Sequence, residues 1–219
     1  ISSSVYMDFY SHLFELCHQD FEARHSAREE ALKHSRLLTR HAAQAIRAIH
    51  RGETAAAEGE LSSCQALLEK VKENLHPFPD LYYSGYTQDA IKEYVEARLT
   101  YCLILELPLP FPTDLGVEFS TYLRGMAETP GELRRRCLDI LRKGYSNEVE
   151  RLLAHMDEIY ALLVTMDYPD AITNGLRHST DHLRGIIERT RADITISLGE
   201  QHLEQALMNL EKKLPNSPD

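Results

Sequence analysis

The sequence predicts an all-α protein of about seven helices in an antiparallel bundle, with a very long helix at its N-terminal end. Two observations support this fold class. Helical periodicity runs through the first fifty residues, which contain neither Gly nor Pro. Strand signals are nearly absent, because the β-branched residues are scattered through helical repeats and do not gather in alternating runs. A chain of 219 residues with 43% hydrophobic and 26% charged residues fits one globular domain over residues 1–219.

The first predicted helix covers residues 5–51, well beyond the usual length of a globular helix. No regular heptad of apolar residues runs through it, so a simple coiled coil is not indicated. Gly52 ends this helix, and a second one is predicted over 54–75. Pro77 and Pro79 then mark a loop.

Prolines and glycines divide the rest of the chain into further helices. Thr87 suits the N-cap of the third helix, and Gly144 stops the fifth. Ser146 or Asn147 starts the sixth, which runs to residue 167. The other predicted helices cover 87–107, 117–127, 130–143 and 169–213, the last interrupted in pattern by three glycines.

Composition limits the compartment and the class of protein. No apolar run is long enough for a transmembrane helix, no signal-peptide pattern opens the chain, and no membrane partner is expected. The four cysteines are far apart and form no Cys-x-x-Cys pair, so they are expected to be free, buried thiols in a reducing cytoplasm.

A basic stripe on the first helix departs from the overall acidity. The formal net charge is −10, which taken alone argues against a nucleic-acid partner. Between residues 31 and 52, however, there is no Asp or Glu. At about 100° per residue, five basic side chains fall within roughly 60° of one another there. A cationic ridge of this kind suits a phosphate backbone, although it is also typical of a solvated face. The basic stripe consists of Lys33, Arg36, Arg40, Arg47 and Arg51.

Two pairs of glutamates are the strongest candidates for a site. Glu93 and Glu96 share one face of the third helix, and Glu128 and Glu132 lie further along the chain. Clustered carboxylates repel one another unless a cation joins them, and Mg²⁺ prefers oxygen ligands of this kind. The spacing alone leaves an ordinary alternative open for Glu96, because Lys92 lies four residues before it on the same helix.

Glu132 also has a purely structural interpretation. Thr129, Pro130, Gly131 and Glu132 read as a capping box with Thr129 as N-cap and Pro130 at the first helical position. Glu128 would then stand just before the cap, where an acid suits the positive end of the helix dipole.

Histidine-based sites are less well supported. Glu15-x-x-His18 and Glu22-x-x-His25 resemble the repeated motif of di-iron bundles. Both copies lie on one helix, so they cannot close around a single di-iron centre. Most of the eleven histidines are interpreted as scattered surface imidazoles.

Three segments in order resemble the translin family. They are RHSAREEALKHSRLLTRHAAQAIRAIHRGE, QDAIKEYVEARL and YLRGMAETPGELRRRCLDIL, and the match is closer to the catalytic branch of translin-associated factor X. The resemblance implies a seven-helix subunit in a hollow, barrel-shaped octamer, with Mg²⁺-dependent endoribonuclease activity inside the barrel. It assigns metal binding and catalysis to Glu93, Glu96, Glu128 and Glu132. Glu128 departs from the family pattern, where an aspartate is common.

The function expected from these residues is hydrolysis of RNA phosphodiesters. Mg²⁺, with Mn²⁺ as a substitute, would activate water, while the basic stripe holds the backbone. Single-stranded RNA is favoured, because no element suited to reading a groove is evident. Asp114 is a further catalytic candidate and equally a candidate N-cap. The competing functions are a translin-like single-stranded RNA- or DNA-binding oligomer without catalysis, and a structural scaffold.

Overall fold

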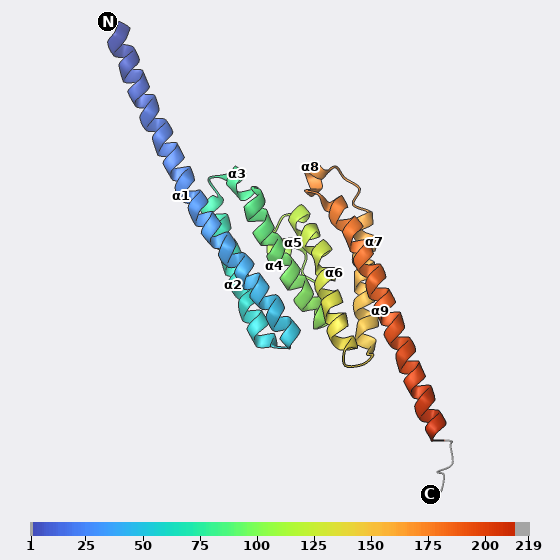
Figure 1. Ribbon diagram of the computed structural model, residues 1–219. Helices are drawn as coiled ribbons and strands as arrows, with labels where there is room; N and C mark the ends of the chain where they lie inside the picture. Colours follow the sequence, from blue (N-terminus) through green and yellow to red (C-terminus); the bar gives the residue numbers. More distant parts are fainter. Residues whose placement is uncertain (1, 213–219) are drawn as a thin grey trace.

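The computed structural model describes residues 2–212, and the side chains of residues 6–212. Within this part of the chain there are nine α-helices and no strand, which confirms the all-α prediction (Figure 1). The six long helices are α1 (Ser2–Arg51), α2 (Thr54–Leu75), α4 (Gly85–Ile104), α6 (Phe119–Leu141), α7 (Asn147–Val164) and α9 (Leu176–Glu211). The three short helices are α3 (Pro79–Tyr82), α5 (Pro112–Leu115) and α8 (Asp170–Thr173).

The long helices lie side by side, with α4 and α6 in the middle of the molecule. On one side α1 packs against both α2 and α4, and on the other side α6 packs against α7 and α9 (Figure 1). Most of the buried apolar side chains form one core that follows this order of helices. The apolar positions of α4 are buried almost all round, because neighbours cover it on both sides.

The two terminal helices extend beyond this body in opposite directions (Figure 1). The side chains of residues 6–23 of α1 and 199–212 of α9 are all exposed. Large apolar residues are frequent among them. On α1 they are Tyr6, Met7, Phe9, Tyr10, Leu13, Phe14, Leu16 and Phe21, and on α9 Leu203, Leu207, Met208 and Leu210.

The predicted break before Pro130 is wrong. A single helix, α6, passes through Pro130, so the two predicted helices over 117–127 and 130–143 are one. Thr129 is buried inside this helix and is not an N-cap, because its hydroxyl donates to the carbonyl oxygen of Gly125 at 3.0 Å. Pro130 has no N–H, so one hydrogen bond to the preceding turn of α6 is missing. The helix continues nevertheless, because Pro130 and its neighbours are packed in the core. The capping-box interpretation of Glu132 therefore no longer applies.

The bounds of α4 and α9 also differ from the prediction. Helix α4 begins at Gly85, so Thr87 lies inside it and donates to the carbonyl of Leu81 at 3.0 Å. It ends at Ile104 rather than at residue 107. Helix α9 starts after Gly175, which has a φ of 83°, and continues through the two glycines expected to interrupt it. Among the described helices, none combines the length and the apolar character needed to cross a membrane.

Candidate metal centre between α4 and α6

A close approach of two helices positions the glutamates. A Cβ atom built on Gly125 of α6 would lie 2.8 Å from the carbonyl oxygen of Lys92 and 2.8 Å from Val95 Cβ, both on α4. Only a glycine permits this contact, because real Cβ atoms do not approach so closely. The acidic faces of α4 and α6 are thereby held next to each other.

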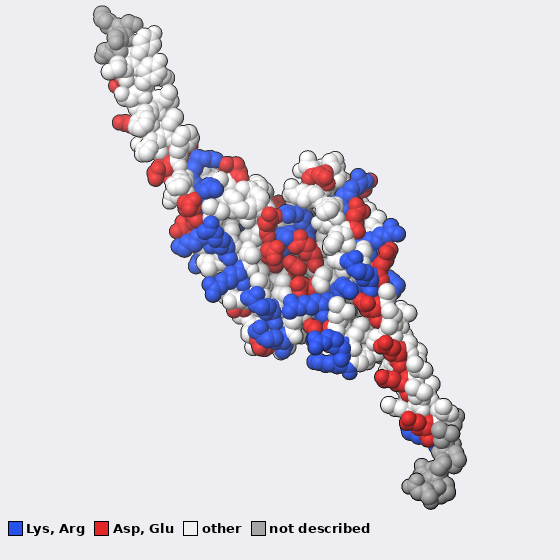
Figure 2. Space-filling model, viewed as in Figure 1, with Lys and Arg blue, Asp and Glu red and all other residues white. Residues whose placement is uncertain are grey.

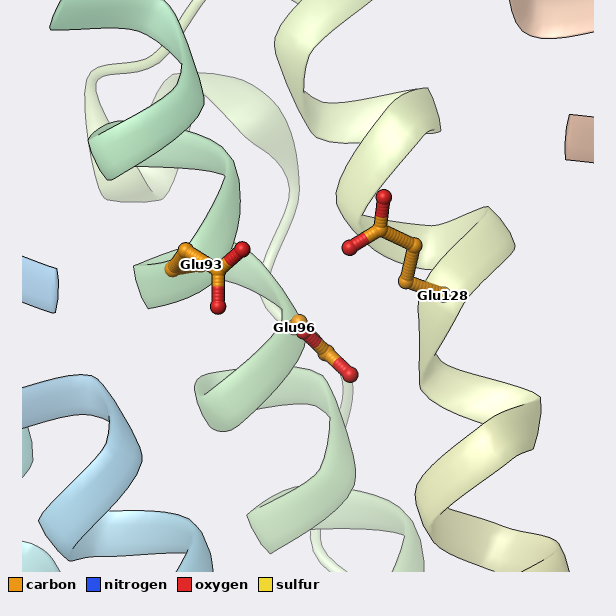
Figure 3. Close-up of side chains that lie close together, drawn as sticks. All are labelled: Glu93, Glu96 and Glu128. Carbon is orange, nitrogen blue, oxygen red and sulfur yellow. The ribbon is translucent and has the colours of Figure 1, made fainter. Parts of the chain in front are cut away.

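Three carboxylates meet at this contact. Glu93 and Glu96 extend from α4 and Glu128 from α6 into the gap between the helices (Figure 3). One ligand oxygen from each lies within 4.8 Å of the others. Among the described residues this is the only group of three or more potential metal ligands. The structure thus brings together three of the four glutamates that the sequence singled out.

Burial among like charges changes the acidity of Glu96. Glu96 is only 9% exposed to solvent. Desolvation, followed by the negative charges of Glu93, Glu128 and Glu132, raises the pKa of Glu96 to about 8. With no cation bound, this side chain is therefore mostly protonated at neutral pH. A divalent cation would reverse this preference by stabilising the carboxylate.

Lys92 is a member of the site. The spacing allowed a salt bridge with Glu96, but the Lys92 ammonium lies 2.5 Å from Glu128 Oε2 and 3.1 Å from Glu93 Oε1. Burial lowers the pKa of Lys92, but hydrogen bonds and charges from Glu128 and Glu93 outweigh this and raise it above its ordinary value. A contact between α4 and α6 creates this pairing, so helical spacing alone could not reveal it.

Glu132 lies at the edge of the group and not within it. Its Oε2 atom is 2.6 Å from His50 Nε2 at the end of α1 and 3.7 Å from Arg135. The His50 side chain is 4% exposed, so it is not one of the surface imidazoles that the sequence suggested. Glu132 is still close enough for its charge to raise the pKa of Glu96.

Asp114 is placed elsewhere. Its Oδ2 accepts a hydrogen bond from the backbone N–H of Phe111 at 2.7 Å, so it caps the short helix α5. It does not belong to the carboxylate group. The capping alternative raised for Asp114 is the one that the structure supports.

The basic stripe lies beside the carboxylates. All five of its side chains are exposed. Lys33 pairs with Glu30 at 3.4 Å and Arg51 with Glu53 at 2.6 Å. Within residues 6–212, Arg36, Arg40 and Arg47 have no ion pair. Figure 2 shows basic side chains along the second half of α1, next to acidic side chains gathered over α4 and α6.

The two Glu-x-x-His motifs do not form a site in the described part of the chain. Glu15, His18, Glu22 and His25 are all exposed on the projecting half of α1. They belong to no group of converging ligands. All four cysteines are free, as expected, but the expected burial is wrong for Cys17, which is exposed because it lies on the projecting half of α1.

The residues at the α4–α6 contact fit a hard divalent cation. They offer carboxylate oxygens only, and these come from two helices that a glycine holds together. The raised pKa of Glu96 results from burial and from the negative charges of Glu93, Glu128 and Glu132, which a bound cation would offset. The Lys92 ammonium supplies one positive charge to Glu93 and Glu128 but forms no ion pair with Glu96 among the described side chains.

Comparison with known proteins shows what the chain is similar to. No family model matches it. An uncharacterized protein of Methanocaldococcus jannaschii is 32% identical over 189 residues, which cover 85% of this chain and 83% of that protein. The structure of AfC3PO in a complex with duplex RNA is 37% identical, with a TM-score of 0.79, and the match covers 85% of this chain and 97% of that one. The structure of apo-NeC3PO, 22% identical with a TM-score of 0.76 over 84% of this chain and 96% of that one, shares the fold.

Proposed function

This chain belongs to the translin family, and from that premise we propose that it is a Mg²⁺-dependent endoribonuclease of the catalytic branch. The observation that supports the proposal most is the convergence of Glu93, Glu96 and Glu128 from two helices, with Glu96 buried. A fold that merely binds a polyanion gains nothing from gathering carboxylates at one point, because they repel both one another and the ligand.

Each glutamate has a distinct part in this proposal. Glu93, Glu96 and Glu128 would hold the cation, which supplies activation of water and stabilisation of charge on the phosphate when bound. Glu132, which contacts His50, would add negative charge at the edge of the site and act as the general base that takes a proton from water. Mn²⁺, which accepts the same oxygen ligands, is the expected substitute.

Lys92 and the basic stripe would position the RNA. Once Glu93 and Glu128 bind the cation, the Lys92 ammonium would be available to a phosphate oxygen of the substrate. The exposed guanidinium groups of Arg36, Arg40 and Arg47 have no competing ion pair among the described residues and suit the backbone on either side. Single-stranded RNA remains the favoured substrate, and the duplex RNA bound by AfC3PO makes a duplex the necessary comparison.

The proposed state is a homo-oligomer, with the octamer as the expected form, in a reducing cytoplasm. Its support is the number of large apolar side chains that the two projecting helix ends expose, because such patches commonly mark interaction surfaces. Enclosure also explains how an acidic protein can bind RNA, since the basic stripe can face an interior while acidic side chains face water.

A translin-like RNA-binding oligomer without catalysis is the second candidate. The observation that favours it is the pairing of Lys92 with Glu93 and Glu128, which balances part of the negative charge without a metal ion. In this alternative the carboxylates would be structural, and RNA would be bound through the basic stripe alone.

The decisive experiment is cleavage of a labelled RNA by wild-type protein and by Glu96→Gln, with Mg²⁺ or EDTA. Single-stranded and duplex forms of one sequence are compared. Glu73→Gln, at an exposed position of α2, is the matched control, and Asp114→Asn tests the capping aspartate. We expect Mg²⁺-dependent cleavage that is lost only in folded Glu96→Gln. RNA binding without cleavage by the wild type would overturn the nuclease proposal in favour of the second candidate.

A further inference from the structure

A basic cavity lies at the C-terminal end of α6. It has a volume of about 630 Å³ and lies among the last turn of α6, the loop to α7 and the end of α1. Its lining includes His50, Arg136, Asp139, Arg142, Lys143 and Ser146. None of these residues belongs to the basic stripe or to the group of three glutamates.

The positive charge at this cavity is only partly compensated. Arg136 is paired with Glu148 at 2.8 Å and is therefore committed to the fold. Arg142 has only a 3.9 Å contact with Asp139, and its side chain is 82% exposed. Lys143 is exposed and has no ion pair within the described part of the chain. Arg142 and Lys143 are thus available to an anion.

The chain turns at this cavity and starts α7 beside it. Gly144, with a φ of 116°, turns the chain sharply after α6 and brings Ser146, the N-cap of α7, to the cavity. The start of this 18-residue helix carries partial positive charge, although the N–H of Glu148 already donates to Ser146 Oγ at 3.3 Å and that of Val149 to the Ser146 carbonyl at 3.1 Å. His50 Nδ1 is buried and lacks a hydrogen-bond partner among the described residues.

His50 connects the cavity with the candidate metal centre. It is part of the cavity wall, while its Nε2 atom contacts Glu132 at 2.6 Å. From Glu132 to Arg142 the axis of α6 rises by ~15 Å. Arg47 of the basic stripe lies one turn before His50 on α1. Figure 2 shows basic side chains both along α1 and around the end of α6, on two sides of the acidic cluster.

We propose that the cavity at the end of α6 binds a phosphate group of the RNA, a few nucleotides from the bond at the carboxylates. Arg142 and Lys143 would contact the phosphate, with the positive end of the α7 dipole beside it. The strand would then be held on both sides of the reacting bond, by the basic stripe and by this cavity. The inference rests on the proposed function only in taking RNA as the ligand.

Binding in EDTA tests this inference separately from catalysis. The Kd for a fluorescein-labelled single-stranded RNA is measured by anisotropy over a series of salt concentrations. The test variant is Arg142→Ala with Lys143→Ala. The control is Lys70→Ala with Arg189→Ala, which also removes two exposed cations but lies outside the cavity. All four side chains are exposed, so neither variant should disturb folding.

If both cations contact phosphate, the slope of log Kd against log salt falls by about 1.4 in the test variant, and the control keeps the wild-type slope. If the ligand is an internal phosphate, the slope falls in the test variant for RNA with and without a terminal phosphate. If the ligand is a terminal phosphate, the slope falls only for RNA that carries one. Equal slopes for the test variant and the control overturn the inference, as does failure of the folded wild type to bind RNA. A changed slope with no cleavage in Mg²⁺ leaves the inference standing and removes the nuclease proposal.

Discussion

Replacing Glu96 by Gln should remove a pH-dependent loss of stability that the site imposes on the protein without metal. In the unfolded chain this carboxyl group ionises near its ordinary pKa of 4.5, whereas in the folded protein its pKa is raised to about 8. The folded state therefore holds a proton that the unfolded state has released between these values. Stability is unaffected by Glu96 below pH 4.5 and falls as the pH rises toward 8.

The size of the effect follows from the same shift. A rise of the pKa from 4.5 to about 8 corresponds to at most roughly 5 kcal/mol in the free energy of unfolding. Gln has nearly the same shape and cannot ionise, so above pH 8 Glu96→Gln should be more stable than the wild type. For a chain of this length the difference in Tm is on the order of 10 °C.

The assay is thermal unfolding between pH 5 and pH 9 at one protein concentration, in EDTA and in Mg²⁺, with Glu73→Gln as control. The wild type and the control should lose stability with rising pH in EDTA, and Glu96→Gln should lose much less. Mg²⁺ should reduce the loss in the wild type, because it stabilises the carboxylate, and should have little effect on Glu96→Gln. Parallel pH profiles of all three proteins in EDTA would refute the reasoning.

Two further substitutions test the geometry of the site. Gly125→Ala forces α4 and α6 apart and should cost ~1–3 kcal/mol, whereas Gly131→Ala, where a Cβ meets nothing within 4 Å, should be neutral or slightly stabilising in urea denaturation. Equal effects of the two changes would contradict the close helix contact. Lys92→Met leaves Glu93 and Glu128 without their ammonium, so Tm in EDTA should fall and the gain in Tm on adding Mg²⁺ should exceed that of the exposed control Lys70→Met. A smaller gain would mean that Lys92 supports cation binding.

The sequence predicted well what depends on local pattern. The end of α1 at Arg51 and both ends of α2 agree with the predicted bounds, because glycine and the apolar period mark them clearly. The acidic face of α4 was also correct, since helical spacing alone determines that Glu93 and Glu96 share a face. The proximity of Glu128 came from the family resemblance and not from any local signal.

The errors arose where tertiary contacts override local signals. Thr129 and Pro130 form a good helix start in isolation, but buried packing carries α6 through them. Lys92 pairs with Glu128 across the contact between α4 and α6. It does not form the surface salt bridge with Glu96 that the spacing along α4 allowed. The contact of His50 with Glu132 joins residues 82 positions apart, and no spacing rule reaches that far.

The order in which the long helices pack has a consequence for how fast the site can form. Each long helix packs mainly against the next long helix in the sequence or against the one after it. Examples of the second kind are α1 with α4 and α6 with α9. Topologies dominated by such local contacts fold rapidly, because little chain entropy is lost before the contacts form. The three converging glutamates belong to two consecutive long helices separated only by the short α5. We therefore expect the ligand set to form rapidly, without a slow search for partners distant in the sequence.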